Sequence, residues 1–243
     1  MKTIARSLLA VTVAAVAPLW VAAPVAAATP TCFGQTATIV GTPGDDVLVG
    51  SADRSDVIFG GGGNDYIAAE DFSVVPLGQP GDFLCGGAGN DTIRGSTGSD
   101  SMAGGYGDDR LDGWVNADVA RGGGGDDWVT DCEGEDAFND DADVLHGGYG
   151  DDHLCTQGSG ADLLTGADGN DTLVDLSCAG SKDLRGGPGN DLFESFYDSF
   201  NGMSCAEQGG DDPDSLHGGQ GWDSAQSSPS DVSTAMESVS IVS

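Results

Sequence analysis

The stretch that decides the fold reads GGAGNDTIR GSTGSDSMA GGYGDDRLD and runs from Gly86 to Asp112. It contains three nine-residue units in phase, each with a glycine-rich turn at its start, an aspartate at its sixth position and an apolar residue at its eighth. A nine-residue period with fixed positions indicates a repeat architecture, in which each unit stacks on its neighbours. The rest of the chain can therefore be placed by position within this unit.

Nine units have an intact glycine-rich turn, and one weaker unit lies between each consecutive pair. The intact turns begin at Gly41, Gly60, Gly86, Gly104, Gly122, Gly147, Gly166, Gly186 and Gly218. Uninterrupted intact turns are 18 residues apart, and longer spacings arise from insertions in the weaker units, at 69–76, 131–137 and 195–208. The sequence thus predicts a repeat of about 18 residues, made of two unequal halves, that accepts insertions on one side only.

The coil that follows from this repeat has two short strands and two turns. Glycines permit the positive φ angles of the turns, and the last three residues of each unit alternate in direction as a strand does, so that the eighth position points inward. The inward residues are Leu48, Ile58, Ile67, Leu84, Ile93, Met102, Leu111, Ala120, Val129, Leu145, Leu154, Leu164, Leu173, Leu184, Phe193, Leu216 and Ala225. We therefore predict an all-β fold of about nine coils around a narrow apolar stack.

One inward side chain per nine residues makes a thin core. Burial of an aliphatic side chain contributes about 1.5–3 kcal/mol, whereas ordering the backbone costs about 1–2 kcal/mol per residue. Burial alone therefore cannot stabilise this fold, and another favourable interaction is required.

The charge of the chain indicates what that interaction is. There are 8 Lys and Arg residues against 40 Asp and Glu residues, a net charge of −32, which becomes −34 without Lys2 and Arg6. Such a charge disfavours nucleic acid and anionic membranes as partners and favours cations. Because the acidic residues recur at repeat intervals rather than in one tail, we expect a folded, cation-binding chain rather than a disordered one.

The units from about Gly41 to Gln226, with turns such as GGGGND at Gly60 and GGYGDD at Gly104, resemble the RTX, or haemolysin-type, calcium-binding nonapeptide repeats. The resemblance implies a right-handed parallel β-roll with Ca²⁺ between turns stacked on the same side, held by sixth-position carboxylates and backbone carbonyls. Calcium takes six to eight oxygen ligands, which aspartates and glycine turns can supply. The implied carboxylate ligands are Asp46, Asp65, Asp91, Asp109, Asp127, Asp152, Asp171, Asp191 and Asp223. The implied turn glycines are Gly60, Gly63, Gly86, Gly89, Gly104, Gly107, Gly122, Gly125, Gly147, Gly150, Gly186, Gly189, Gly218 and Gly221.

Nine stacked turns leave eight gaps, so up to eight ions are expected on this edge. The weaker turns carry sixth-position aspartates too, but most lack the glycines, and we favour solvated acidic turns there; these residues are Asp56, Asp82, Asp100, Asp118, Asp143, Asp162 and Asp214. In one weaker unit Lys182 replaces the aspartate. Because carboxylates repel one another without metal, we expect calcium binding and folding to be one event.

Residues 1–28 have the pattern of a secretory signal peptide, with Lys2 and Arg6 before an apolar run and three alanines at its end. A transmembrane anchor is the first alternative, but Pro18 and Pro24 interrupt the apolar run and alanine dominates it. The second alternative is a lipoprotein linked at Cys32, but the residues at 29–31 lack the leucine and small residue that such a signal needs. We therefore predict a secreted protein without a stable membrane anchor. An N-terminal cap at 29–40 precedes the repeats at 41–226, and a closing strand at 227–243 follows them.

Six cysteines in an exported chain favour disulfides, with fifteen possible pairings. Adjacent coils favour the pairs Cys132–Cys155 and Cys178–Cys205, which leaves Cys32 to pair with Cys85. A rival set pairs Cys155 with Cys178.

The function predicted is calcium binding without catalysis. The sequence contains no nucleophile-elbow, metalloprotease or phosphate-loop motif, and its three histidines lack zinc-ligand spacing. Two alternatives stay open: an extracellular adhesion or glycan-interaction module that uses the insertions, and a polysaccharide-active enzyme of the β-helix type.

Overall fold

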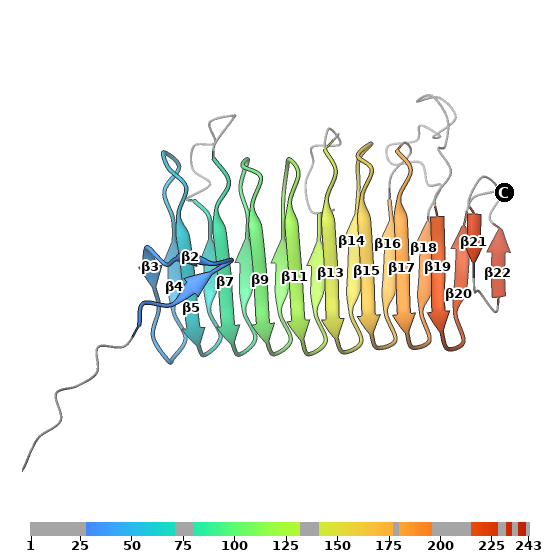
Figure 1. Cartoon of the computed structure of the whole chain (residues 1–243), viewed down its shortest axis with the longest axis horizontal. Helices are drawn as coiled ribbons and strands as arrows, with labels where there is room; N and C mark the ends of the chain where they lie inside the picture. The colour runs from blue at the N-terminus through green and yellow to red at the C-terminus, as the bar shows by residue number, and fades with distance from the viewer. Residues whose placement is uncertain are drawn as a thin grey trace, which may run out of the picture.

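The computed structural model describes residues 28–70, 80–131, 141–176, 180–195, 215–227, 232–234 and 238–241. Within these ranges the chain winds into coils, and each coil adds one strand to each of two parallel ten-stranded sheets (Figure 1). The all-β coil that the nonapeptide period predicts and the parallel strand arrangement that the resemblance implies are thus confirmed.

Every strand pairs with the equivalent strand of the next coil, so the pairing repeats the period of the sequence. The long-strand sheet contains β3 (Ile39–Val40), β5 (Val57–Gly62), β7 (Phe83–Ala88), β9 (Ser101–Tyr106), β11 (Val119–Gly124), β13 (Val144–Tyr149), β15 (Leu163–Asp168), β17 (Asp183–Pro188), β19 (Ser215–Gln220) and β21 (Val232–Thr234). The short-strand sheet contains β4 (Val47–Val49), β6 (Tyr66–Ala68), β8 (Thr92–Arg94), β10 (Arg110–Asp112), β12 (Trp128–Thr130), β14 (His153–Thr156), β16 (Thr172–Asp175), β18 (Leu192–Ser195), β20 (Ser224–Ser227) and β22 (Ser238–Ile241).

The long strands differ from the three-residue strands that the sequence predicts. In β9 the expected strand residues 101–103 are followed by Gly104, Gly105 and Tyr106, which belong to the glycine-rich turn. These turn residues still pair with their neighbours, because Gly105 is in register with Gly87 and Gly123. The first half of each such turn is therefore extended sheet, and only its second half reverses the chain.

The inward stack is confirmed at every predicted position in the described residues. Leu111 of β10, for example, is in register with Ile93 and Val129 of the adjacent coils. The eighth-position residues from Ile58 to Ala225 are at most 3 % exposed and form one continuous cluster, and Leu48 in the first coil is partly buried against it.

The residues before the first coil form a short antiparallel hairpin, β1 (Thr31–Cys32) and β2 (Gln35–Thr36), that lies across β5 and β7 (Figure 1). Its cluster includes Cys32, Phe33 and Phe83, and the predicted disulfide from Cys32 to Cys85 is confirmed. The hairpin thus covers the flank of the long-strand sheet, whereas residues 39–40 of the predicted cap begin the first coil as β3.

Two strands, β21 and β22, follow residue 227 where the sequence predicts one, and they pair with β19 and β20 to add a tenth coil. Cys155 is disulfide-bonded to a cysteine outside the described residues, so its pairing with Cys132 or Cys178 stays a prediction. Residues 1–27 and most of the three insertions also lie outside them, and so do the signal-peptide and glycan-module predictions. The described residues contain no helix, hence none long and apolar enough to cross a membrane.

Candidate metal centres

The nine intact turns connect the long strands to the short strands and stack along one edge of the fold, the lower edge in Figure 1. We call this the glycine edge; it consists of the turns that begin at Gly41 and at the other eight positions given above. The fourth turn is typical: β9 enters it through Gly104, and Asp109 leaves it at the start of β10.

From the second intact turn onward, the second and fourth residues have positive φ angles, and all of them except Ala167 are glycines. Gly105 and Gly107 have φ angles of 121° and 117°, which L-residues rarely adopt. A Cβ atom on Gly107 would also lie only 2.6 Å from the carbonyl carbon of Gly89 in the preceding coil. The carbonyls of the second and fourth residues therefore point across the gap at the next coil, which makes them available oxygen ligands.

The sixth-position aspartates form a ladder that runs the length of the glycine edge. Oδ1 of each aspartate accepts a hydrogen bond of 2.7–3.0 Å from the backbone N–H of the sixth residue in the preceding coil. Asp109, for example, accepts from Asp91 and donates its own N–H to Asp127. The aspartates predicted as ligands are thus brought together in consecutive pairs, from Asp46 to Asp223.

The second carboxylate oxygen of this ladder is buried without a hydrogen-bond partner. Among the described residues this holds for Oδ2 of seven aspartates, Asp65, Asp91, Asp109, Asp127, Asp152, Asp171 and Asp191. A buried polar atom with no partner costs about 1–3 kcal/mol, and more if it is charged. Seven such atoms in register indicate that the edge is built to receive a ligand between its coils.

Glycine at the first position leaves room beside that oxygen. A Cβ atom on Gly86 would collide with Oδ2 of Asp91 in its own turn and would lie 2.7 Å from the carbonyl oxygen of Gly104 in the next. Carboxylate and carbonyl oxygens from two coils therefore border the same small space. No group of three or more His, Cys, Asp or Glu side chains that could hold a metal occurs among the described residues, so a bound ion requires these carbonyls. Such an all-oxygen donor set fits a hard cation such as Ca²⁺.

Burial dominates the ionisation of these aspartates. It raises the pKa of Asp91 and Asp171 to about 6 and that of Asp109 and Asp127 to about 7, against an ordinary value of 3.8. Neighbouring aspartates raise these pKa values further, and the ladder hydrogen bonds lower them. The ionised ladder is thus unfavourable until a cation is bound.

Calcium affinity is expected to fall as the pH is lowered from 8 to 5.5. The folded-state pKa values of about 6 to 7 lie above the unfolded value, so ionisation destabilises the metal-free fold at neutral pH and protonation relieves it in acid. Protons then compete with the ion for the same oxygens. Calcium titrations at pH 8, 7, 6 and 5.5 should show a rising midpoint, with most of the change below pH 7. A midpoint that stays constant over this range would contradict the assignment of these carboxylates.

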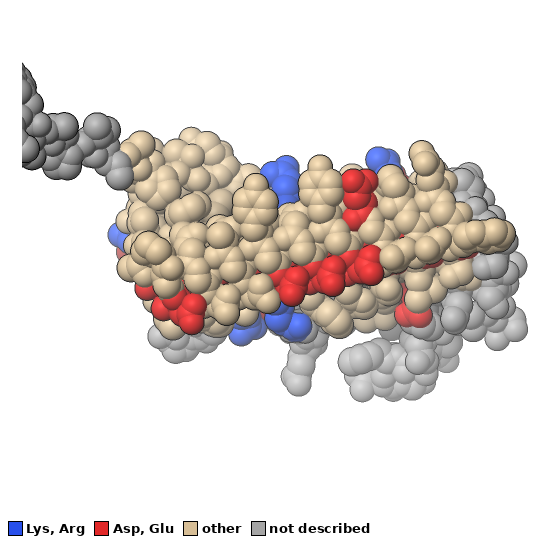
Figure 2. All heavy atoms as spheres, turned by 90° about the horizontal axis from the view of Figure 1, so that it is seen from below, with Lys and Arg blue, Asp and Glu red and all other residues tan. Residues whose placement is uncertain are grey.

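A second ladder, which the sequence analysis missed, lies beside the first at the fifth position. Its Asn or Asp Oδ1 atoms accept hydrogen bonds of 2.7–3.1 Å from the N–H of the fifth residue in the next coil. Asn90 and Asp108 serve equally as acceptors, so this ladder needs no charge. Its side chains are exposed, and Asp108, Asp126 and Asp151 among them are acidic. Figure 2, which views the molecule from below, shows a row of acidic residues along the glycine edge. The signal for this second ladder in the sequence was an Asn or Asp at the fifth position of eight of the nine intact turns.

The opposite edge, which we call the inserted edge, consists of the weaker turns that end at Asp56, Asp82, Asp100, Asp118, Asp143, Asp162 and Lys182. The aspartates among these residues are at most 4 % exposed, so the expectation of solvated acidic turns is wrong for them, whereas Asp214 lies outside the described residues. They form the same kind of ladder, in which each Oδ1 accepts a hydrogen bond of 2.6–2.9 Å from the preceding coil. The stacking of coils buries these side chains even where the turn glycines are absent.

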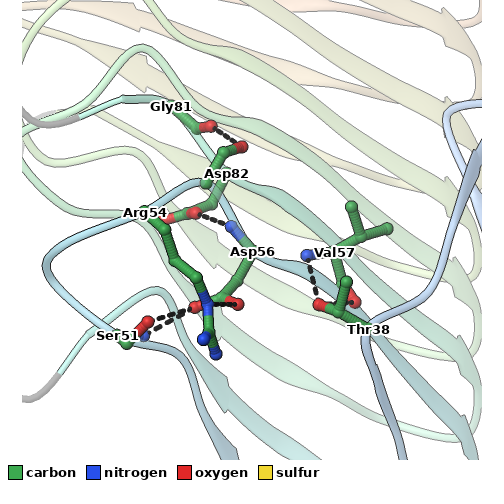
Figure 3. A network of polar contacts seen from close by, with 8 residues as sticks. Thr38, Ser51, Arg54, Asp56, Val57, Gly81 and Asp82 are labelled. Carbon is green, nitrogen blue, oxygen red and sulfur yellow. Dashed lines mark hydrogen bonds and ion pairs between the residues drawn. The ribbon is translucent and has the colours of Figure 1, made fainter.

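The two edges differ in what satisfies Oδ2. On the inserted edge Ser51 donates both its N–H and its hydroxyl to Asp56, which also pairs with Arg54 at 2.9 Å (Figure 3). The N–H of Ser96 bonds to Asp100, and the hydroxyl of Thr156 bonds to Asp162. Burial alone would raise the pKa of Asp56, but its hydrogen bonds from Arg54 and Ser51 lower it. For Asp56, Asp100 and Asp162, protein groups thus donate to the Oδ2 atom that on the glycine edge is left without a protein donor.

Asp118 is the exception on the inserted edge. Its Oδ2 is buried without a hydrogen-bond partner, and burial, together with Asp100 and Asp143, raises its pKa to about 10. Among the described aspartates of this edge, Asp118 is therefore the one that most resembles those of the glycine edge, because its Oδ2 also lacks a donor.

Comparison with known protein families gives one clear result. The model of the RTX calcium-binding nonapeptide repeat matches the chain repeatedly, and its matches together cover more than half of the 243 residues. The matched ranges are 40–72, 86–120, 115–136, 139–156, 158–174 and 208–224. A search of curated proteins gives no match.

Proposed function

Because the chain belongs to the RTX calcium-binding nonapeptide repeat family, we propose that it is a secreted protein whose glycine edge binds a row of Ca²⁺ ions and which folds as they bind. The family is one of calcium-binding repeats and not of enzymes. The single observation that carries the proposal is the series of seven buried Oδ2 atoms without partners, one per coil, each beside a turn whose carbonyls face the next coil.

The ladder suggests an upper limit for the number of ions. Eight Oδ1 hydrogen bonds join nine turns, so eight gaps are available between Asp46 and Asp223. The ligands in a gap are the sixth-position carboxylates of its two coils and carbonyls of first-, second- and fourth-position residues. Eight divalent ions would offset sixteen of the negative charges on a chain whose net charge is −32. Affinities of about 10⁻⁴–10⁻³ M, as in extracellular modules, suit this role.

Coupled folding and binding follows from the same geometry. Without metal, buried carboxylates of adjacent coils repel one another, and the thin apolar stack cannot compensate for this repulsion and for the ordering of the backbone. With metal, each ion joins two coils and removes the repulsion. A chain with the predicted signal peptide would thus stay unfolded where calcium is scarce and fold after export.

Circular dichroism during a calcium titration tests this proposal. The spectrum in excess chelator should be that of a largely unstructured chain, and β-sheet signal should appear cooperatively between about 10⁻⁴ and 10⁻³ M calcium. Magnesium, which requires stricter geometry and retains its waters, should have little effect at the same concentration. A complete β-sheet spectrum in excess chelator would contradict the proposal.

A further inference from the structure

The aspartate ladder of the inserted edge ends at Asp162, because the sixth position of the next coil is Lys182. The backbone continues in register through this point: the N–H of Asp183 donates to the carbonyl of Asp162 at 2.9 Å, and that of Ser215 donates to the carbonyl of Lys182 at 2.8 Å. Only the side chain changes, from an anion to a cation.

Lys182 is fully buried, and its ammonium group reaches back into the gap between the two coils. Nζ donates to the carbonyl oxygens of Gly160 at 2.6 Å and Gly158 at 3.0 Å. It also lies 3.5 Å from Oδ2 of Asp162. The cation therefore contacts two backbone carbonyls and one carboxylate of the preceding turn.

These three oxygens match those left available on the glycine edge. Counted back from Asp162, Gly158 and Gly160 are the second and fourth residues of their turn, and Gly158 has the positive φ of a second-position glycine, 108°. The equivalents in the turn of Asp91 are the carbonyls of Gly87 and Gly89 and Oδ2 of Asp91 itself. The lysine on the inserted edge thus contacts the same three kinds of oxygen that the glycine edge offers to an ion.

We propose that the ammonium group of Lys182 takes the place of a calcium ion in the gap between the turns of Asp162 and Lys182. This inference rests on the proposed calcium function of the glycine edge. A tethered cation needs no dissolved calcium, so in the folded chain this pair of coils is joined on its inserted edge by the protein itself. Asp162 is at the same time unavailable to metal, since its Oδ2 is shared by Thr156 and Lys182.

Two substitutions separate a calcium substitute from an ordinary buried lysine. Lys182→Met keeps most of the length of the side chain and removes the cation, so the two carbonyls and Asp162 lose the ammonium group as a partner. Lys182→Asp restores the acidic sixth position, and with it the ladder and a possible metal site. Arg185→Met is the matched control, because Arg185 is a half-exposed cation in β17, the strand that directly follows Lys182, and it pairs with Asp183 on the surface.

The measurements are urea unfolding at saturating calcium and the number of calcium ions bound per chain, by equilibrium dialysis. We expect Lys182→Met to raise the unfolded-to-folded ratio at least tenfold at a fixed urea concentration, and Arg185→Met to change it less than twofold. Lys182→Asp should bind one more ion than the parent chain, and its stability should depend more steeply on calcium.

If Lys182→Met has the same urea midpoint of unfolding as the parent chain, the inference is overturned. It is also overturned if Lys182→Asp folds but binds no additional ion. If Lys182→Asp does not fold, Lys182→Met alone decides. A parent chain that binds no calcium would instead refute the proposed function, and a destabilised Lys182→Met would still show that the ammonium joins the two coils.

Discussion

Asp109→Asn is expected to lower the free energy of unfolding of the calcium-bound protein by about 3–5 kcal/mol, the cost of breaking a buried ion pair from one side. Asparagine can keep the Oδ1 acceptor for the N–H of Asp91, but it puts an NH₂ donor in place of the buried Oδ2 and removes the charge. Because Asp109 borders two gaps, at least one ion per chain should also be lost. Urea unfolding in saturating calcium and the count of bound ions measure both effects.

Asp108→Asn is the matched control for this substitution. Asp108 is exposed, and its Oδ1 accepts the N–H of Asp126 at 3.0 Å, a contact that Asn90 makes in the same way one coil earlier. The change should therefore stay within about 0.5 kcal/mol, as for most surface substitutions. Equal effects of Asp108→Asn and Asp109→Asn would show that net charge, and not the buried carboxylate, determines stability.

Gly107→Ala is expected to destabilise the protein by about 3–5 kcal/mol. The residue has a φ of 117°, where an L-residue is strained by about 1–3 kcal/mol. Its Cβ atom would also overlap the carbonyl group of Gly89, and overpacking against backbone costs about 1–3 kcal/mol more. The coils on both sides prevent relaxation, so the two costs should add, and thermal unfolding in calcium should show a large loss of stability.

Gly124→Ala provides the comparison, since Gly124 has no left-handed φ and the nearest atom to its new Cβ would be Cδ1 of Tyr106, at 3.9 Å. It should change stability by no more than about 0.5 kcal/mol. If both variants unfold at the same temperature, the tight stacking of fourth-position glycines is not what the turns require.

The period of the sequence was sufficient to predict the coil, the two parallel sheets and the inward stack from Ile58 to Ala225. These features depend on spacing alone, because a residue eight positions into each unit has the same surroundings in every coil. The row formed by Asp91, Asp109 and their equivalents was predictable for the same reason, whereas their role as calcium ligands was implied by the resemblance to RTX repeats and stays a prediction. The hydrogen bonds of this row could not be predicted from the sequence, because they depend on which of the two carboxylate oxygens faces the preceding coil.

The inserted edge was predicted less well. Its turns were judged by their missing glycines, but stacking buries Asp56 and Asp100 whether or not a glycine precedes them. The groups that satisfy them, such as Ser51 and Ser96, look like ordinary turn residues in the sequence. The role of Lys182 also required the structure, since only the fold shows that its side chain reaches the preceding turn.

The most direct test of a calcium row along one edge is a crystal structure of the protein grown in calcium, with anomalous scattering used to identify the ions. The account predicts peaks in the gaps of the glycine edge, among them one between Asp91 and Asp109, each with carboxylate and carbonyl oxygens at 2.3–2.6 Å. It also predicts no peak between Asp162 and Lys182. A folded protein with an empty glycine edge at saturating calcium would contradict the account.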